Sequence, residues 1–474
     1  MTMKKKRDLT TGSIYKNLLW VAIPTLLSSL VQMAYNLTDM FWVSRVTSMG
    51  LDQSDAVTAV GTGGFYMWMG FGFIILIKIG TSVNVSQAAG RDDSEDVAKY
   101  GSNGFILMVL FAIFYSIIGF VFKEEFVGLF GYTKDIVISD SVDYLGVVSA
   151  FVIFMFLVNL FSGIYDGLGL TIMTFVIVAT GLIFNMILDP FFILDQVTVF
   201  GQTYDGLGLT VKGAAIATVI SQGLVLLIFI LIYMSKLRPF DLHLKKYFSK
   251  EHMKSILRIG YPVGVQSILF TIIAVIITIM LAGYGEEVVA TQRVGSQIEA
   301  LAWMIASGFQ VALASFVGQN YGAGRLDRVR KGYIAAIKIL IPYGIAVNLL
   351  LFFFSEQLFS IFIQEADTLP LGILYLRVLS VSQLFMILEL ATAGAFNGLG
   401  KTKYPSGVGI VGNFLRIPMA YLLALSLGYV GIWWAISISS ILKGTVIMIM
   451  FSLFLRKLCL RDGSVLELTE LEIE

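Results

Sequence analysis

The chain has 474 residues, of which 57% are hydrophobic and only 14% are charged, and its mean hydropathy is +0.84. These values exclude an ordinary water-soluble globular protein. The formal net charge of +1 does not point to a charged partner, and we expect no nucleic acid to bind. The single cysteine, Cys459, excludes an internal disulfide bond and a thiolate metal site.

Twelve long apolar segments follow one another along the chain. A helix that crosses a bilayer needs about 20 mostly apolar residues. Membrane β-barrels show short alternating segments instead, so the pattern predicts an all-α integral membrane protein with twelve transmembrane helices. The segments lie near residues 15–44, 57–83, 101–122, 138–165, 171–194, 212–234, 259–283, 288–317, 333–355, 371–396, 406–427 and 432–455.

The two halves of the chain repeat four short motifs. The pairs are Ile23-Pro24 with Tyr261-Pro262, 89–91 with 323–325, 163–169 with 394–400, and Asp189-Pro190 with Ile417-Pro418, and the separation within a pair shrinks steadily along the chain. Six segments per half give both copies the same orientation, so we expect two six-helix bundles related by a pseudo-twofold axis along the membrane normal. The expected parts are an N-terminal lobe (1–234), a basic linker (235–258), a C-terminal lobe (259–455) and a tail (456–474).

The positions of Lys and Arg predict the orientation in the membrane. If the N-terminus is cytoplasmic, 23 of the 33 bases fall on the cytoplasmic side and only four fall outside. Basic loops stay on the cytoplasmic side, so we expect a multi-pass protein of the cell membrane with both termini in the cytoplasm. The seven bases of the linker are placed to rest on anionic lipid headgroups.

Ionisable residues inside membrane segments are costly and are therefore candidates for function. In the first segment, Gln32, Tyr35, Asn36 and Asp39 share a helical face that should point into the bundle interior. The alternative is that Asp39 lies in the outer interface near Arg45. Pro24 removes one backbone hydrogen bond of this helix and gives it a place to bend.

The fifth and sixth segments add further polar groups. Asn185 and Asp189 are one helical turn apart, and Pro190 follows, so the pair could hold a proton or a small cation or could form an Asp-Pro turn at the helix end. Thr218 and Gln222 make a similar pair on the sixth segment, and Thr218 could supply a hydroxyl ligand.

Both signs of charge occur within the segments of the second half. Glu299 and Glu389 are candidate counter-charges for a cationic substrate, whereas Arg416 and Lys443 could pair with them in a structural network. His243 and His252 both lie in the linker, so no histidine cluster is available for zinc or iron. No P-loop signature is present, and we expect no cofactor.

Four stretches together resemble the multidrug and toxic compound extrusion (MATE) family, and the similarity extends from Leu18 to about Leu455. The stretches are 23–39, 297–301, 317–324 and 398–402. The resemblance implies two six-helix lobes and transport of organic cations against an H+ or Na+ gradient. It also implies a transporter rather than an enzyme, which we expect to act as a monomer in the lipid bilayer.

The resemblance also implies where the coupling ion binds. In DinF-type members the cation site lies in the first lobe, and its residues correspond to Asp39, Asn185, Asp189 and Thr218, with Na+ as a possible ligand of the first three. NorM-type members have a glutamate on the seventh helix, but residues 263–271 contain no acid. The chain is therefore DinF-like rather than NorM-like in this respect.

Two other functions remain open. A flippase for lipid-linked oligosaccharide would need a cavity dominated by Arg and Lys to hold pyrophosphate, and the best-placed groups here are acids. An intramembrane enzyme would need a catalytic motif, and the segments show no His-Glu zinc motif and no paired-aspartate signature.

Overall fold

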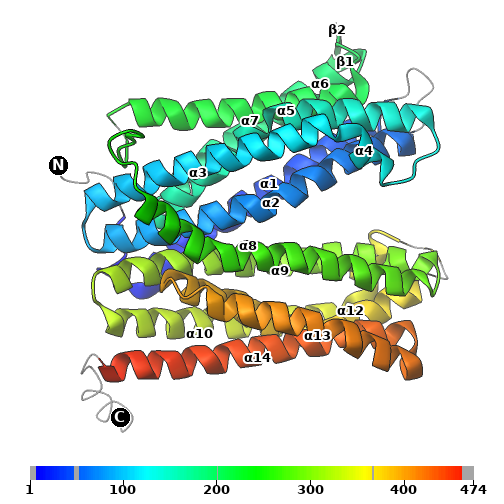
Figure 1. Ribbon diagram of the computed structural model, residues 1–474. Helices are drawn as coiled ribbons and strands as arrows, with labels where there is room; N and C mark the ends of the chain where they lie inside the picture. The colour runs from blue at the N-terminus through cyan, green and yellow to red at the C-terminus, as the bar shows by residue number, and fades with distance from the viewer. Residues whose placement is uncertain are drawn as a thin grey trace. The chain divides into compact units, whose positions relative to one another are not determined.

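A computed structural model describes residues 7–46, 53–199, 201–236, 238–363, 365 and 368–461. These residues form long helices and one small hairpin (Figure 1). The elements are α1 (Ile14–Val43), α2 (Gln53–Gly90), α3 (Ser94–Val121), α4 (Lys123–Gly128), α5 (Asp135–Gly167), α6 (Thr171–Ile193), β1 (Gln196–Val199), β2 (Gln202–Asp205), α7 (Thr210–Met234), α8 (Lys250–Ala282), α9 (Glu286–Gly322), α10 (Leu326–Phe353), α11 (Ser355–Ser360), α12 (Leu369–Gly398), α13 (Lys403–Leu427) and α14 (Tyr429–Arg461).

Twelve of these helices are long and apolar enough to cross a membrane, which confirms the predicted number and order of spans. The remaining two, α4 and α11, have six residues each. Several helices extend past the apolar segments, because backbone hydrogen bonding continues into polar residues beyond the hydrocarbon layer. Helix α8 shows this best: it begins at Lys250, inside the stretch predicted as linker.

The described residues pack into two compact units, each with its own core. The first unit contains Leu27–Val85 and Ser94–Gly260, and the second contains Arg7–Leu26, Ser86–Asp93 and the chain from Tyr261 onward. Helices α1 and α8 are each divided between the units close to their prolines, Pro24 and Pro262. The first turns of each helix therefore pack with one unit, and the rest packs with the other.

The turns after α2 and α9 have the same structure. Their comparison changes the predicted alignment of 89–91 with 323–325 between the two halves. Asp92 (φ 61°) and Gly324 (φ 72°) both adopt the left-handed conformation. The amide of the next residue, Asp93 or Arg325, donates to the carbonyl five residues earlier, on Ala88 or Asn320. The structure therefore aligns Gly324 with Asp92 and not with Gly90, which lies within α2.

Close helix contacts at glycines determine how α2 and α5 align with α9 and α12. A Cβ on Gly63 would overlap the Tyr144 ring, and a Cβ on Gly295 would overlap the Tyr375 ring. Gly63 on α2 therefore aligns with Gly295 on α9, and Tyr144 on α5 aligns with Tyr375 on α12. Helices α1 and α8 keep the alignment that their prolines suggested.

A second set of glycine contacts relates α6 and α7 to α13 and α14. Gly181 packs against Val225, and Gly412 packs against Lys443. These contacts align Gly181 on α6 with Gly412 on α13, and Val225 on α7 with Lys443 on α14. Asp189 is therefore opposite Ala420, and the sequence alignment of the Asp-Pro motif with the Ile-Pro motif was wrong.

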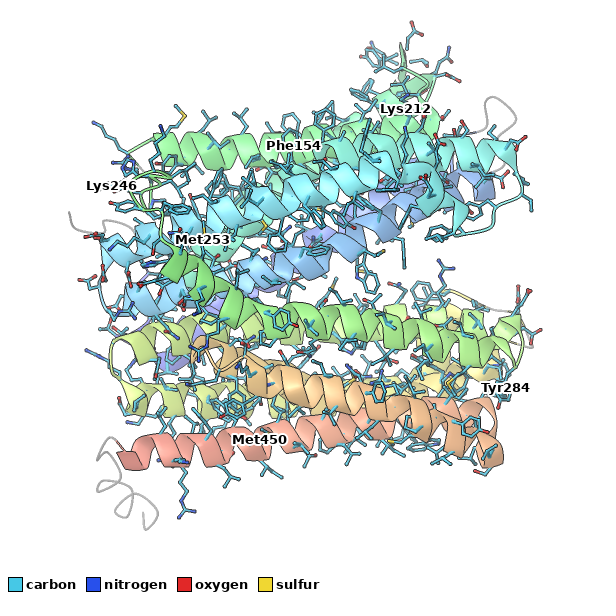
Figure 2. The ribbon with its side chains drawn as sticks, in the orientation of Figure 1. Phe154, Lys212, Lys246, Met253, Tyr284 and Met450 are labelled. Carbon is cyan, nitrogen blue, oxygen red and sulfur yellow. The ribbon has the colours of Figure 1, made fainter. Side chains whose placement is uncertain are left out.

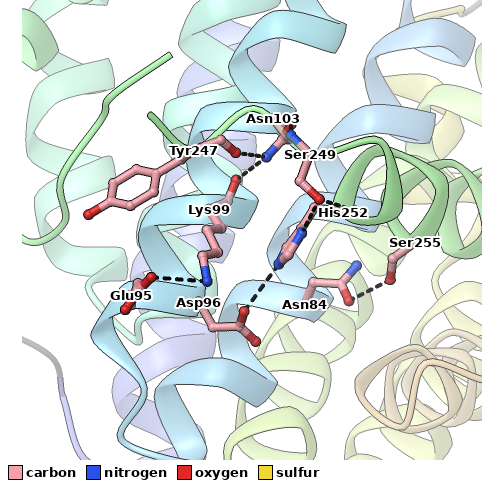
Figure 3. Close-up of polar contacts among 9 residues, drawn as sticks. All are labelled: Asn84, Glu95, Asp96, Lys99, Asn103, Tyr247, Ser249, His252 and Ser255. Carbon is pink, nitrogen blue, oxygen red and sulfur yellow. Dashed lines mark hydrogen bonds and ion pairs between the residues drawn. The ribbon is translucent and has the colours of Figure 1, made fainter. Parts of the chain in front are cut away.

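The linker between α7 and α8 is tied to helices of the first unit (Figure 3). The Asn103 side chain on α3 donates to the Tyr247 carbonyl (2.8 Å) and accepts from the Ser249 amide (2.9 Å). His252 Nε2 lies 3.1 Å from Asp96 Oδ1, and the Ser255 hydroxyl donates to Asn84 Oδ1 (3.0 Å). These contacts fix the start of α8.

The segment before α1 is held in a comparable way by the second unit. The guanidinium of Arg328, on α10, donates to the carbonyls of Leu9, Thr11 and Gly12 at 3.1–3.3 Å. Asn320 donates to the Leu9 carbonyl (3.1 Å), and Leu9 is fully buried. Three main-chain carbonyls thus surround one cation before the helix begins.

Between α6 and α7 the chain forms an antiparallel hairpin, which the sequence analysis did not predict. Strands β1 and β2 pair from Gln196 with Asp205 to Val199 with Gln202, at the end of α6 (Figure 1). Lys212, labelled in Figure 2, follows the hairpin at the start of α7 and forms an ion pair with Asp143 on α5 (3.1 Å).

Candidate functional site: a buried carboxyl pair

Helix α1 brings two polar side chains into the first unit. Tyr35 and Asp39 are one turn apart, and their side chains are 7% and 4% exposed. Asp39 is therefore buried rather than interfacial. Gln32 is exposed and lies outside this buried cluster, and the side chain of Asn36 is outside the described residues.

Helix α6 supplies the second carboxyl. Asn185 Nδ2 donates to Asp189 Oδ1 (2.8 Å), and both residues are fully buried. Pro190 lies inside α6, which continues to Ile193, so Asp189 belongs to the helix and not to a turn at its end.

Helix α7 completes the group. The Thr218 hydroxyl donates to Asp39 Oδ2 (2.9 Å), and the side chains of Asn185 and Asp189 also contact the Asp39 carboxyl. The structure thus brings together, from three helices of one unit, the four residues that the family resemblance implied as a cation site.

This cluster has more acceptors than donors. Asp39 Oδ1, Asn185 Oδ1 and Asp189 Oδ2 are buried and accept no hydrogen bond from the described residues. Two carboxyl groups in contact cannot both stay ionised at low cost in a buried site. A proton shared between them, or a small cation among the three oxygens, would satisfy the unpaired acceptors.

Lys78, a half-buried base on α2, contacts other groups of the first unit. Its Nζ donates to Asn159 Oδ1 (3.4 Å), and it interacts electrostatically with Asp166. Within the described residues, no group of three or more His, Cys, Asp or Glu side chains is arranged to hold a metal ion. The site described above has only two carboxyl groups, with one amide and one hydroxyl beside them.

Two tyrosines flank the carboxyl pair. The Tyr35 hydroxyl lies against Gly181, and Tyr144, on α5, is buried against Gly63. Both rings interact electrostatically with Asp39 and Asp189. The sequence analysis missed Tyr144, for which the only signal is a polar atom in an apolar helix.

On α7 the buried neighbour of Thr218 is Ser221, one turn away, and not the Gln222 that the sequence analysis paired with it. The Ser221 hydroxyl is buried without a partner among the described residues. Helix α7 therefore carries a second buried hydroxyl one turn from Thr218.

The second unit pairs its buried charges. Lys443 Nζ lies 3.2 Å from Glu389 Oε2, with the side chains 7% and 14% exposed. Glu299 is 2% exposed and contacts Tyr375 and Gln383. Arg416 donates from Nε to the Ser439 hydroxyl (2.9 Å). Glu299 and Glu389, the candidate counter-charges for a substrate, thus lie in a network with bases. A structural network of this kind was the alternative given in the sequence analysis.

Comparisons with known proteins extend over both units. A family model described as MatE matches residues 24–191 and 262–422. The chain is 23% identical over 448 residues to a probable multidrug resistance protein NorM of Thermotoga maritima, with 92% of each chain covered. It is 25% identical over 441 residues to a probable multidrug resistance protein YoeA of Bacillus subtilis, with 91% of each covered.

The fold is also that of solved structures. The outward-facing conformation of a multidrug resistance MATE family transporter of the MOP superfamily matches with a TM-score of 0.85 at 23% identity. The match covers 96% of this chain and 99% of that chain. It establishes the likeness of the folds.

Proposed function

Because the chain belongs to the MatE family, we propose that it is a secondary active transporter that exports cationic amphipathic compounds in exchange for H+ or Na+. The relatives named as multidrug resistance proteins support the substrate class. We place the protein in the cell membrane with both termini in the cytoplasm, as the distribution of its bases favours.

The observation that carries the proposal is the unpaired carboxyl cluster of Asp39 and Asp189. An antiporter needs a site that binds its coupling ion differently in the inward-facing and outward-facing states. The three unpartnered oxygens are acceptors for such an ion, and the hydroxyl of Thr218 and the amide of Asn185 set its geometry. We assign ion coupling to this first-unit cluster, as in DinF-type members.

A lipid-linked oligosaccharide flippase fits these side chains less well. Such a protein would hold an anionic pyrophosphate, and a buried pair of acids would repel it. Among the described residues, the two buried bases of the second unit are already engaged, Lys443 with Glu389 and Arg416 with two serines. A cationic substrate is therefore the better match.

The test is transport of ethidium by the purified protein in vesicles, with the proton and sodium gradients imposed separately. We expect uptake driven by one of the two gradients and abolished by Asp39→Asn. The exposed Lys134→Gln variant, which alters an ion pair with Asp55 that is not part of the cluster, serves as the control. Transport that ignores both gradients would refute the proposal.

A further inference from the structure

The second unit has its own copy of the place where the carboxyl cluster lies. With Gly412 aligned to Gly181, Arg416 takes the position of Asn185, and Ala420 takes the position of Asp189. With Pro262 aligned to Pro24, Ile277 takes the position of Asp39. Ile277 and Ala420 are 2% and 0% exposed, so the copy is equally buried.

Helix α14 contributes the matching hydroxyl. With Lys443 aligned to Val225, Ser439 takes the position of Ser221. Arg416, 8% exposed, donates from Nε to Ser439 (2.9 Å) and from Nη2 to Ser440 (3.4 Å). The carboxyl cluster of the first unit contains two acids and no base. Its copy in the second unit contains instead a guanidinium that donates hydrogen bonds to two hydroxyls.

The acids around this guanidinium come from other helices. Arg416 interacts electrostatically with Glu299 on α9 and with Glu389 on α12. Glu389 is also paired with Lys443, and Glu299 Oε1 is buried without a hydrogen-bond partner among the described residues. Two acids thus face two bases, and the cluster is neutral without an added ion.

We propose that Arg416 is a tethered cation that fills the second unit's copy of the ion site and keeps it closed to exchangeable cations. The inference rests on the proposed function, since it assumes that the first-unit cluster is the ion site. Removal of the Arg416 side chain would leave Glu299 and Glu389 with one base between them. The vacated space would include the volume of the guanidinium group, and free guanidinium is the ligand that it should accept.

The experiment measures the thermal unfolding of the purified full-length Arg416→Ala variant in detergent. Guanidinium chloride at millimolar concentration is compared with equal NaCl and equal urea. We expect the variant to unfold several degrees below the wild type, and guanidinium alone to recover part of that loss. Wild type and Arg293→Ala, which removes an exposed base from α9, should not be stabilised by guanidinium.

An Arg416→Ala variant that guanidinium stabilises no better than NaCl or urea would overturn the proposal. If that variant does not accumulate, Arg416→Asn is used instead, because Asn is the residue at the aligned position 185. Stabilisation by guanidinium alone would again support the proposal, and its absence would again overturn it. The readout does not depend on transport. A wild type that fails to move ethidium would refute the proposed function and leave this measurement intact.

Discussion

Asp39 accepts a hydrogen bond from Thr218 through Oδ2, and its buried Oδ1 has no hydrogen-bond partner among the described residues. An amide at this position would keep the size of the side chain but could not exchange a proton or neutralise a cation. Asp39→Asn should therefore lose gradient-driven efflux, by about tenfold or more, while expression and Tm stay near wild type. Vesicle transport under an imposed gradient measures this, and normal drug resistance in cells expressing the variant would contradict it.

Asp39 and Asp189 should act as one unit because their carboxyl groups are in contact. Residues that share a site show non-additive effects. The Asp39→Asn/Asp189→Asn double variant should transport about as poorly as either single variant. Transport losses that multiply in the double variant would indicate two separate sites.

Gly181 lets the Tyr35 hydroxyl and the Val225 side chain approach α6. A methyl group there would overlap both, so Gly181→Ala should lower stability by about 1–3 kcal/mol and impair transport. Gly64→Ala is the matched control, because a Cβ at Gly64 has no neighbour within 4 Å. The comparison is made by Tm and by ethidium transport, and equal effects of the two substitutions would rule out the packing argument.

At the scale of single elements, the linker between α7 and α8 depends on Asn103. Its amide group satisfies both the Tyr247 carbonyl and the Ser249 amide. Asn103→Ala should cost about 1–3 kcal/mol and make the linker more sensitive to limited trypsin digestion at Lys245 and Lys246. Asn103→Asp retains the acceptor for Ser249 and should fall between wild type and Ala; a trypsin pattern unchanged in both variants would contradict this role.

The helices and the separate polar candidates could be predicted from the sequence because their signals are local, whereas only the resemblance to the MATE family joined Asp39, Asn185, Asp189 and Thr218 into one site. Twelve apolar runs specify twelve helices, and an acid such as Asp39 in an apolar run is conspicuous. The register between the two halves could not be predicted, because it depends on which glycine packs against which helix. For that reason the match of Arg416 with Asn185 was visible only in the structure. The β1–β2 hairpin was not predicted, although β-branched residues at 197–199 precede Gly201 and Thr203-Tyr204 follow it.

For the whole molecule, the contrast between the units predicts a division of labour. Glu389→Gln would leave the buried Lys443 without its partner, at a cost of about 3–5 kcal/mol. We expect that variant to have a lower Tm or an altered range of drugs and still to respond to the driving gradient. The measurement is the transport of several cationic drugs at two gradients. If Glu389→Gln lost coupling while Asp39→Asn kept it, the roles of the units would be reversed.

The contacts that hold the starts of α1 and α8 have opposite polarity. Arg328 and Asp96 occupy the same position in the repeat, each as the third residue of its helix. Arg328 binds main-chain carbonyls ahead of α1, whereas Asp96 binds a histidine within α8. A chimera built from two copies of the first half would have an aspartate at the position of Arg328, next to the carbonyls that Arg328 now binds. A chimera of that kind should therefore fold only if a base replaces the aspartate at the position of Arg328.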